Sequence, residues 1–590
     1  MFQTFDSTTS PETGAPRLAA LRAEMANRQL SGYLVPRADA HQGEYVAPCD
    51  ERLAWLTSFT GSAGFCAVLE NAAGVFIDGR YRVQVKDQVD LAVFEPVPWP
   101  ETQLGPWLIE REASGRIGFD PWLHTKREID AVERALEDQD VTLVAVPNLI
   151  DLIWQDRPPA PSGLAEIYPI ELAGRSSADK RTEISEVLKT AGHSAAVLTL
   201  PDSIAWLLNI RGTDIARIPI VQAFAILFDD TRVELFSNPA KFSEISLGPD
   251  VKLRDFSEFN LALTELNGSI RVEKSSAPLQ ISNILKNSDI VYDDDPCGLP
   301  KACKNPVEIE GARAAHLRDA HAMVEFLAWL DMQEPGAFTE IDVVTQLEGF
   351  RTKTNALRDI SFETISGTGP NGAIVHYRVT HETNRRVEDG NLLLVDSGGQ
   401  YVDGTTDITR TIAIGTPSPE QIRCYTLVLK GMVSLSMARF PTGISGRDLD
   451  PLARAALWRD GLDYDHGTGH GVGAFLSVHE GPQRIARISE VKLAPGMILS
   501  NEPGYYREGA FGIRIENLIV VQSAPKMGDN RDQLSFETLT YVPFDRRLID
   551  PELLSPQERA WIDDYNAEIA RRIAASPAAN AWLAKATAPL

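Results

Sequence analysis

Five potential metal ligands lie between positions 396 and 516 of the chain, each in a distinctive local sequence. They are Asp396 in VDSGG, Asp407 in TTDITRT, His470 in GTGHGVG, Glu502 in NEPGYY and Glu516 in RIENL. Four carboxylates with one imidazole suit divalent cations such as Mn(II), Mg(II) or Zn(II), whereas a thiolate-rich set would indicate structural zinc. Two such cations can hold a hydroxide between them and deliver it to a carbonyl or phosphoryl group. The five residues therefore predict a two-metal hydrolase.

Strand-like segments carry the two aspartates. NLLLVD ends at Asp396, turn residues follow, and the β-branched run TTDITRTIAI contains Asp407. Two strands joined in this way can present both aspartates on one face of a sheet. The aspartates are eleven positions apart, an odd number, so we expect the loop or a bulge to set the match of their faces.

The other ligands follow comparable signals. DYDHGTGHGVG places His466 and His470 among small residues that allow a close approach of the backbone. Glu502 follows the strand-like MILSNE and precedes a Pro-Gly turn. Alternation along GIRIENLIVV predicts that Arg514 and Glu516 share one face of a strand.

The bulk composition is that of an acidic globular protein. The chain has 590 residues, 43% hydrophobic and 24% charged, a length that predicts about three domains. A formal charge of −25 and a pI near 4.9 argue against a nucleic-acid partner, because phosphate contacts need clustered Lys and Arg. Five scattered cysteines without CxxC spacing favour free thiols, so we expect the cytoplasm. Neither a signal peptide nor an apolar run long enough for a membrane span is predicted.

A first α/β unit opens the chain. We expect residues 1–15 to be a flexible lead-in. From Gly32 to about Gln155, short apolar runs alternate with helical stretches, which is typical of α/β domains. The Pro-rich stretch DRPPAPSG (156–163) then predicts a boundary.

A second α/β unit follows at 175–295. Its Trp206 lies in an AWL tripeptide that matches the AWL of Trp55 in the first unit, and both follow a strand that ends in a proline turn. This match predicts an internal duplication. The segment DDDPCGLPKACKNPVE (293–308) predicts a second boundary, and a long helix is expected to begin at Val307.

The order Asp, Asp, His, Glu, Glu in these settings resembles the pita-bread metallopeptidases, which include methionine aminopeptidase, prolidase and Xaa-Pro aminopeptidase (aminopeptidase P). Each residue alone has an ordinary explanation, as a turn aspartate, a solvated glutamate or a tight loop, so the combined pattern carries the resemblance. The sequences PRADAHQGEYVAPCDERLAWLTSFTGSAG and IDGRYRVQ resemble the long, three-domain cytosolic type of aminopeptidase P. The resemblance covers nearly the whole chain and is weakest in the middle domain and at the N-terminus.

This resemblance implies a fold with α/β and α+β parts. Two creatinase-like N-terminal α/β domains (1–160 and 161–300) would precede a pita-bread catalytic domain with a C-terminal helical extension (301–590). The activity implied is release of the N-terminal residue from peptides with proline in second position, by attack of a metal-bridging hydroxide.

The resemblance also implies how the five ligands share two divalent ions, with Mn(II) favoured over Zn(II) or Co(II). Asp396 would bind one ion, and His470 and Glu502 the other, while Asp407 and Glu516 would bridge the pair. Glu502 would also act as general base, and His470 would also face the substrate.

Three histidines fall where this family carries substrate-handling histidines: His376 in PNGAIVHY, His466 before GTGHG, and His479 in SVHEGP. The resemblance implies that His479 and His466 stabilise the tetrahedral intermediate and that His376 lines the site near the proline ring. Arg514 would either orient a substrate group or form an ion pair behind a ligand. Arg80 in DGRY is a candidate contact for longer peptides, with a purely structural arginine as the alternative.

The implied partners are a peptide with a penultimate proline and a second copy of the chain, with no nucleic acid or membrane. LSPQERAWIDDYNAEIARRIA predicts an amphipathic helix with Ser555 as its N-cap, which would pack on its own domain or help to form a homodimer.

Three alternatives stay open. Prolidase, which cleaves only Xaa-Pro dipeptides, has the same ligands and is disfavoured by the duplicated N-terminal half. Methionine aminopeptidases are commonly single catalytic domains. A non-catalytic relative could retain the fold as a peptide-binding platform, and metal content would distinguish it from an enzyme.

Overall fold

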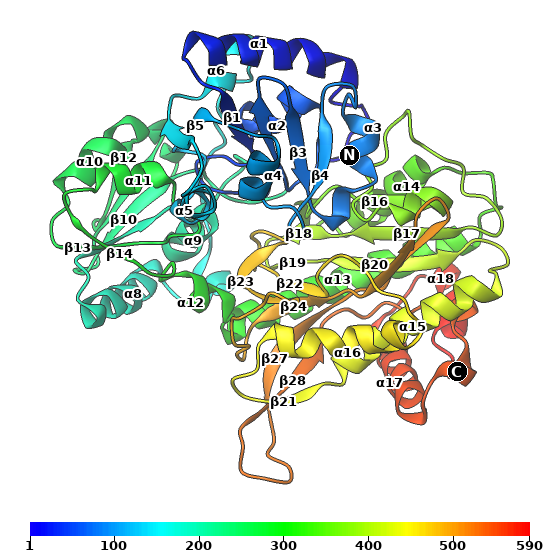
Figure 1. Ribbon diagram of the computed structural model, residues 1–590. Helices are drawn as coiled ribbons and strands as arrows, with labels where there is room; N and C mark the ends of the chain where they lie inside the picture. Colours follow the sequence, from blue (N-terminus) through cyan, green and yellow to red (C-terminus); the bar gives the residue numbers. More distant parts are fainter. The chain divides into compact units, whose positions relative to one another are not determined.

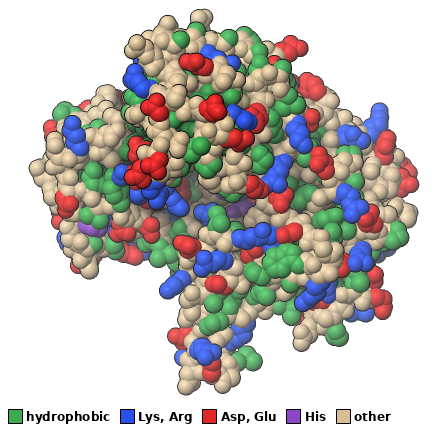
Figure 2. Space-filling model, viewed as in Figure 1, with side chains coloured by type: hydrophobic (Ala, Val, Ile, Leu, Met, Phe, Trp, Pro, Cys, Tyr) green, Lys and Arg blue, Asp and Glu red, His purple; other side chains and the backbone are tan.

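The computed structural model describes residues 1–590, which divide into two compact units. Residues 8–298 form an N-terminal unit, and residues 299–590 together with residues 1–7 form a second unit that contains all five predicted ligands. None of the helices combines the length and the apolar composition of a membrane-spanning segment. Acidic and basic side chains are interspersed over the face of the molecule drawn in Figure 2.

The N-terminal unit contains two six-stranded sheets. The first has the strand order β4 (Glu95–Pro98), β3 (Ala73–Ile77), β2 (Phe65–Leu69), β1 (Gly32–Pro36), β5 (Gly115–Phe119) and β6 (Val141–Ala145). The second has the order β12 (Val251–Asp255), β11 (Val233–Ser237), β10 (Phe224–Phe228), β8 (Ala195–Leu198), β13 (Ser269–Val272) and β14 (Asp289–Tyr292).

The helices of this unit connect or cover these strands (Figure 1). They are α1 (Gly14–Asn27), α2 (Arg52–Thr57), α3 (Gln84–Gln88), α4 (Leu104–Glu110), α5 (Lys126–Ala135), α6 (Leu149–Ile153), α7 (Ile170–Ala173), α8 (Ser177–Ala191), α9 (Pro201–Leu208), α10 (Phe259–Glu265) and α11 (Leu279–Ile284).

The two sheets repeat one topology, which confirms the predicted internal duplication. In each sheet, the first strand in chain order pairs antiparallel with the second and parallel with the fifth, and the outer pairs are parallel. The two AWL tripeptides occupy equivalent helices, α2 and α9, which are the first α-helices after β1 and β8. The short shared sequence therefore marks a repeat of the whole α/β unit.

The prediction of a flexible lead-in over residues 1–15 is wrong. Gln3 and Phe5 are buried in the second unit, with exposed fractions of 2% and 9%, and α1 already begins at Gly14. The polar composition of the segment hid this order, because its contacts are made by one amide and one aromatic ring with residues more than 300 positions away.

The second unit carries four sheets, of three, three, two and six strands (Figure 1). Their strands are, in spatial order, β16 (Ile365–Thr368), β17 (Leu392–Ser397), β20 (Ile408–Ala413); β15 (Leu357–Ile360), β18 (Gly399–Tyr401), β19 (Gly404–Thr405); β25 (Gly504–Arg507), β26 (Phe511–Arg514); and β21 (Arg439–Pro441), β28 (Gln533–Thr538), β27 (Asn517–Ala524), β24 (Ile498–Asn501), β22 (Gly469–Gly471), β23 (Glu480–Ile485).

Long helices with strong N-terminal caps surround these strands. They are α13 (Pro306–Asp331), α14 (Glu340–Thr352), α15 (Pro419–Ser436), α16 (Gly446–Arg459), α17 (Pro556–Arg572) and α18 (Pro577–Ala586), preceded by the short α12 (Gly298–Ala302). Capping boxes open α13 at Asn305 and α15 at Ser418. The predicted C-terminal helix is confirmed as α17, with Ser555 as its N-cap and Ile562 and Tyr565 buried.

Strand β17 is buried along its whole length, which explains why its sequence LLLVDS is a continuous apolar run rather than an alternation. Leu392, Leu393 and Val395 join the core formed by α13, α15 and α17. Asp396 follows these apolar residues directly in β17, so core packing sets the position of its carboxylate.

A close backbone approach fixes the segment that precedes His376. A Cβ atom on Gly512, in β26, would overlap the carbonyl oxygen of Gly372 in the 3₁₀ turn η6 (Gly369–Ala373). We therefore expect Gly512→Ala to lower the free energy of unfolding by about 1–3 kcal/mol, because backbone must move to accommodate the methyl group. Differential scanning calorimetry measures the change.

The matched control is Gly349→Ala in helix α14, where an added Cβ meets no atom within 4 Å. We expect that variant to be neutral or stabilised by about 0.5–1 kcal/mol, since alanine is the better helix former. Equal melting temperatures for the two variants would contradict the close packing of Gly512 on Gly372.

Candidate metal centre

The register of β17 and β20 places the two aspartates on one side of the sheet. Asp396 lies opposite Thr409 in an antiparallel pair, and Asp407 precedes Thr409 by two residues. Residues opposite each other, and residues two apart, point to the same face. The β17–β20 pairing has no bulge. The connection that contains β18 and β19 therefore brings the two aspartates to the same face despite their odd spacing in the sequence.

His470 and Glu502 come from neighbouring strands of the six-stranded sheet and are joined through Ser500. The Nε2 atom of His470 lies 3.4 Å from Asp407 Oδ2 and 3.5 Å from Glu502 Oε1. The hydroxyl of Ser500 accepts a hydrogen bond from the backbone N–H of His470 (2.9 Å) and donates one to Glu502 Oε1 (3.1 Å). Strand pairing thus brings the imidazole and the second glutamate to the aspartates.

The tautomer of His470 suits metal binding. Its Nδ1 lies 3.0 Å from the carbonyl oxygen of Gly471, and a carbonyl can only accept, so Nδ1 carries the hydrogen. In the neutral ring, Nε2 then presents its lone pair to Asp407 and Glu502. A backbone carbonyl that fixes the tautomer in this way is the usual partner of a ligating histidine.

Arg514 and Glu516 meet at Thr409, although the single strand expected for them is wrong. The chain changes from β26 to β27 between these residues, which separates two short strands. Arg514 Nε donates to Thr409 Oγ1 (3.2 Å), and that hydroxyl donates to Glu516 Oε2 (2.9 Å). Arg514 Nη2 also donates to Asp396 Oδ2 at 2.6 Å. The two side chains therefore reach one site, as their predicted shared face required, and Arg514 forms the ion pair that was one of its two expected roles.

Three buried carboxylate oxygens of this cluster have no hydrogen-bond partner: Asp396 Oδ1, Asp407 Oδ1 and Glu516 Oε1. Leaving a buried acceptor unpaired is costly, and an oxygen of this kind beside an imidazole lone pair is a natural cation ligand. One ligand atom each from Asp407, His470 and Glu516 lies within 4.8 Å of the others. The residues present therefore fit divalent cations.

The electrostatics of the cluster indicate the same. Burial, reinforced by the neighbouring carboxylates, raises the pKa of Asp407 and of Glu516 well above the ordinary range. Burial also raises the pKa of Glu502, while His470 and Arg514 oppose that rise. Like charges this close cannot all ionise unless cations compensate them.

The three predicted histidines lie around the cluster. The ring of His479 packs edge-on against His470, with centroids 4.3 Å apart. His466 Nε2 is hydrogen-bonded to Tyr506 Oη at 2.9 Å. The segment of His376 is held at the site through the preceding carbonyl of Val375, which accepts from Arg514 Nη1 at 3.3 Å.

Sequence reasoning missed Tyr506, which connects these groups. Its hydroxyl accepts a 2.6 Å hydrogen bond from Arg514 Nη1 and bonds His466. Burial raises its pKa to about 12, so it stays protonated. Tyr506 belongs to the NEPGYY sequence and lies four positions after Glu502. Its contact with Arg514 depends on the pairing of β25 with β26, which the local sequence does not show.

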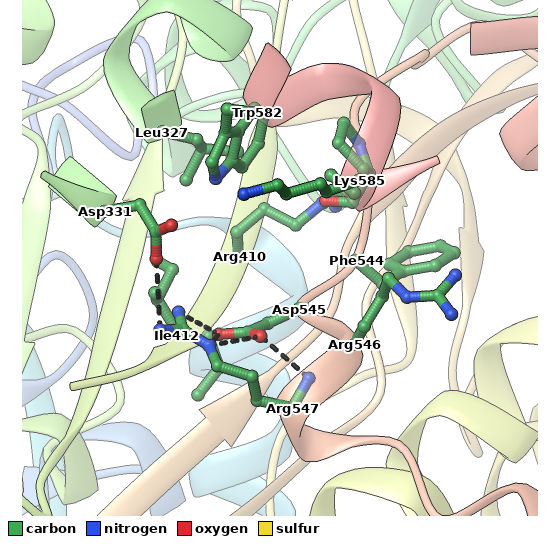
Figure 3. Close-up of a pocket in the computed structure, with 13 residues that line it drawn as sticks. Leu327, Asp331, Arg410, Ile412, Phe544, Asp545, Arg546, Arg547, Trp582 and Lys585 are labelled. Carbon is green, nitrogen blue, oxygen red and sulfur yellow. Dashed lines mark hydrogen bonds and ion pairs between the residues drawn. The ribbon is translucent and has the colours of Figure 1, made fainter. Parts of the chain in front are cut away.

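Arg410 was also missed, although it belongs to the Asp407 motif TTDITRT. It is fully buried in β20 and donates to the carbonyl oxygen of Glu516 (2.6 Å), to Asn517 Oδ1 (2.8 Å) and to Tyr565 Oη of α17 (3.2 Å). Figure 3 shows Arg410 beside a cavity that residues of the C-terminal segment, among them Phe544, also line. The C-terminal region thus supports the backbone of one ligand.

Arg80 belongs to the N-terminal unit. Its guanidinium pairs with Asp78 at 2.7 Å and with Glu44 at 3.7 Å. This pairing gives it a structural role within that unit, and its predicted contact with long peptides stays a prediction.

Three buried carboxylates, the partly buried Glu502 and a histidine whose free nitrogen faces Asp407 and Glu502 form a cluster suited to a dinuclear metallohydrolase. The sequence matches the models of four regions: metallopeptidase family M24 (310–523), the creatinase/prolidase N-terminal domain twice (17–153 and 156–308), and the C-terminal region of peptidase M24 (532–590). The chain belongs to metallopeptidase family M24.

Full-length relatives agree with this assignment. The probable Xaa-Pro aminopeptidase P of Coccidioides posadasii (strain C735) is 39% identical, over 96% of this chain and 91% of the relative. The protein of the same description from Aspergillus fumigatus (strain Af293) is 38% identical, over 97% and 92%. The crystal structure of X-prolyl aminopeptidase from Caenorhabditis elegans, described as a cytosolic enzyme with a di-nuclear active site, superposes with a TM-score of 0.93 at 32% identity, over 98% of this chain and 100% of that one. The resemblance and the fold predicted from the sequence are confirmed.

The raised pKa values predict how the metal-free protein responds to pH. When a carboxyl has a higher pKa folded than unfolded, the native state binds more protons, so the stability it contributes is full below the unfolded pKa of about 4 and is lost as pH rises. We expect the melting temperature of protein stripped of metal to fall between about pH 5 and pH 8 because Asp407 and Glu516 must ionise while buried together. Calorimetry after chelation measures this.

Asp407→Asn removes one of these titrations and should therefore reduce the loss of stability at high pH. Asp403→Asn is the matched control, because Asp403 lies in the same connection between β17 and β20 and its carboxylate is paired with Arg318 of α13. Added Mn(II) should raise stability more at the higher pH, since it binds the deprotonated ligands. A metal-free wild type that responds to pH just as Asp407→Asn does would contradict the raised pKa of Asp407.

Proposed function

We propose that this protein is an Xaa-Pro aminopeptidase that releases the N-terminal residue from peptides with proline in second position. The observation that carries the proposal is the convergence of all five ligand residues, with His376, His466 and His479 around them, in a chain that is similar over its whole length to relatives described as Xaa-Pro aminopeptidases.

Two divalent cations, with Mn(II) proposed ahead of Zn(II) or Co(II), complete the centre. Asp396 would hold one cation, His470 and Glu502 would hold the other, and Asp407 and Glu516 would contribute to both. When bound, the cations polarise the peptide carbonyl and lower the pKa of a water molecule so that hydroxide forms near neutrality. The three unpaired buried oxygens and the Nε2 lone pair of His470 support the binding of cations at this cluster.

Glu502 acts as the general base. Its side chain stays 17% exposed, more than that of Asp407, so it can meet a water molecule from solvent. Ser500 holds one of its oxygens in place. Glu502 takes a proton from the attacking water and later returns it to the prolyl nitrogen.

His479 and His466 stabilise the negative charge that develops on the carbonyl oxygen, a contribution of about 3–4 kcal/mol for one well-placed donor. Contact with the His470 ring orients His479, and Tyr506 orients His466. His376 lines the proline pocket. Arg514 acts on Asp396, whose carboxylate it holds, and so positions a ligand instead of the substrate.

The choice of proline follows from the bond. An Xaa-Pro bond is a tertiary amide without an N–H, and the ring fixes the backbone, so enzymes that recognise the N–H are disadvantaged. A site that activates the carbonyl strongly and recognises the ring in a pocket is not. Arg80 is a candidate contact for longer peptides, and its ion pairs with Asp78 and Glu44 would then orient it.

We further propose a division into domains at 1–160, 161–300 and 301–590, a homodimer, and the cytoplasm as the compartment. The two repeated sheets support the first boundary. Five free cysteines support a reducing compartment, as does the similarity to a relative described as cytosolic.

The proposal predicts hydrolysis of Arg-Pro-Pro by the Mn(II)-loaded protein with release of free arginine, followed by mass spectrometry. Gly-Pro should be a poor substrate and Met-Ala peptides should remain intact, because the site is proposed to need a penultimate proline in a chain that continues beyond it. Hydrolysis restricted to Gly-Pro would instead identify a prolidase.

Asp407→Ala should abolish the activity with loss of at least one metal ion, since the charge of two cations is then poorly compensated. Asp403→Ala is the control, because Asp403 lies four positions before Asp407 and is paired with Arg318. This variant should retain both metals and full activity. A wild-type protein that binds peptide without metal would favour the non-catalytic relative.

A further inference from the structure

Residues 2–6, at the start of the chain, are bound to the same unit as the metal centre. The side-chain amide of Gln3 pairs with the backbone of Thr364: Oε1 accepts from the N–H at 2.8 Å, and Nε2 donates to the carbonyl at 3.4 Å. The carbonyl oxygen of Phe5 accepts from the N–H of His381 at 2.9 Å. Arg378 donates to the carbonyl oxygens of both Thr4 and Asp6, each at 3.0 Å.

The ring of Phe5 lies in a small apolar cluster that reaches the active-site residues. Tyr377 and Leu394 are buried in this cluster, and Ile374 and Tyr506 pack against it. Tyr377 follows His376 directly, Leu394 precedes Asp396 by two residues in β17, and Tyr506 bonds both His466 and Arg514. The Phe5 ring therefore belongs to the same apolar cluster as residues that neighbour or bond His376, His466 and Asp396.

The segment it holds has little support of its own. Residues 374–381 form no strand and no helix, so no ladder of backbone hydrogen bonds fixes them. The segment's anchors to the rest of the unit include Arg514, which donates to the carbonyl of Val375 at 3.3 Å, and the hydroxyl of Tyr377, which bonds Glu340 at 3.0 Å. Residues 2–6 hold the other end of the segment, at Arg378 and His381. Segments of this kind open locally at a small free-energy cost unless tertiary contacts hold them.

We propose that Gln3 and Phe5 are positioning residues for catalysis, which hold the 374–381 segment so that His376 faces the substrate. This inference rests on the proposed role of His376 in the Xaa-Pro aminopeptidase reaction. It assigns a function in the catalytic unit to a part of the chain that lies before both repeated sheets, more than 370 positions from His376.

The test compares Phe5→Ala with Phe2→Ala, two identical substitutions in one segment. Phe5 is 9% exposed and Phe2 38% exposed, so only the first change empties a packed site. For Phe5→Ala on the Mn(II)-loaded, full-length protein, we expect kcat/KM for Arg-Pro-Pro to fall about 10- to 100-fold, mostly through KM, because a displaced contact residue weakens substrate positioning. Metal content should stay at the wild-type value. Phe2→Ala should match wild type.

A merely structural role would give a different pattern. Partial unfolding lowers the fraction of active enzyme and therefore kcat, but leaves KM unchanged. Gln3→Ala provides a second variant that removes the amide pair with Thr364 and keeps the ring. It should also raise KM, to a smaller extent.

Hydrogen exchange separates this inference from the proposed function. We expect Phe5→Ala to speed amide exchange at 374–381 and at Thr364, with little change in the β17–β20 pair, whether or not the wild type cleaves Xaa-Pro bonds. Unchanged exchange in 374–381 together with an unchanged KM would overturn the inference. Failure of the wild type to cleave Arg-Pro-Pro would overturn the proposed function instead.

Discussion

The catalytic unit depends on the mutual repulsion of carboxylates that its strands hold together in a buried site. Asp396, Asp407 and Glu516 are almost inaccessible to solvent, and Glu502 lies beside them. Charges so close in a medium of low polarity repel strongly, and Arg514 offsets only part of this. The fold keeps them in place with rigid elements: a fully buried strand, two hydroxyl bridges through Thr409 and Ser500, and the backbone support from Arg410. The unpaired oxygens left at the centre are what two cations would bind.

Much of the site could be predicted from the sequence, because its residues occur in local patterns that have chemical meaning. Asp396 follows an apolar strand and Glu502 precedes a Pro-Gly turn, so the local structure around each could be predicted from the sequence. The histidines were found through family resemblance, since a lone histidine such as His376 carries no local signal. Tyr506 and Arg410 lie inside quoted motifs, yet each acts on a residue reached only by strand pairing. Their roles depend on tertiary geometry and could not be read from spacing.

The fold shows the same division. An AWL tripeptide in each half predicted the repeated α/β topology, and a capping sequence predicted α17. Both features are determined by local sequence. The first residues were misjudged for the opposite reason. Their order comes from contacts with Thr364, Arg378 and His381, hundreds of positions away, and a short polar sequence does not reveal that it will be held by such partners. Irregular segments are defined by what packs on them, so sequence patterns constrain them least.

The central claim is that the four carboxylates and His470 hold two cations. A crystal structure of the Mn(II)-loaded protein, with anomalous diffraction collected at the manganese absorption edge, tests it most directly. Two anomalous peaks should appear, both in contact with Asp407 and Glu516, one also touching Asp396 and the other His470 Nε2 and Glu502. The absence of anomalous peaks from this cluster, with Asp407 and Glu516 instead joined by a shared proton, would contradict the account.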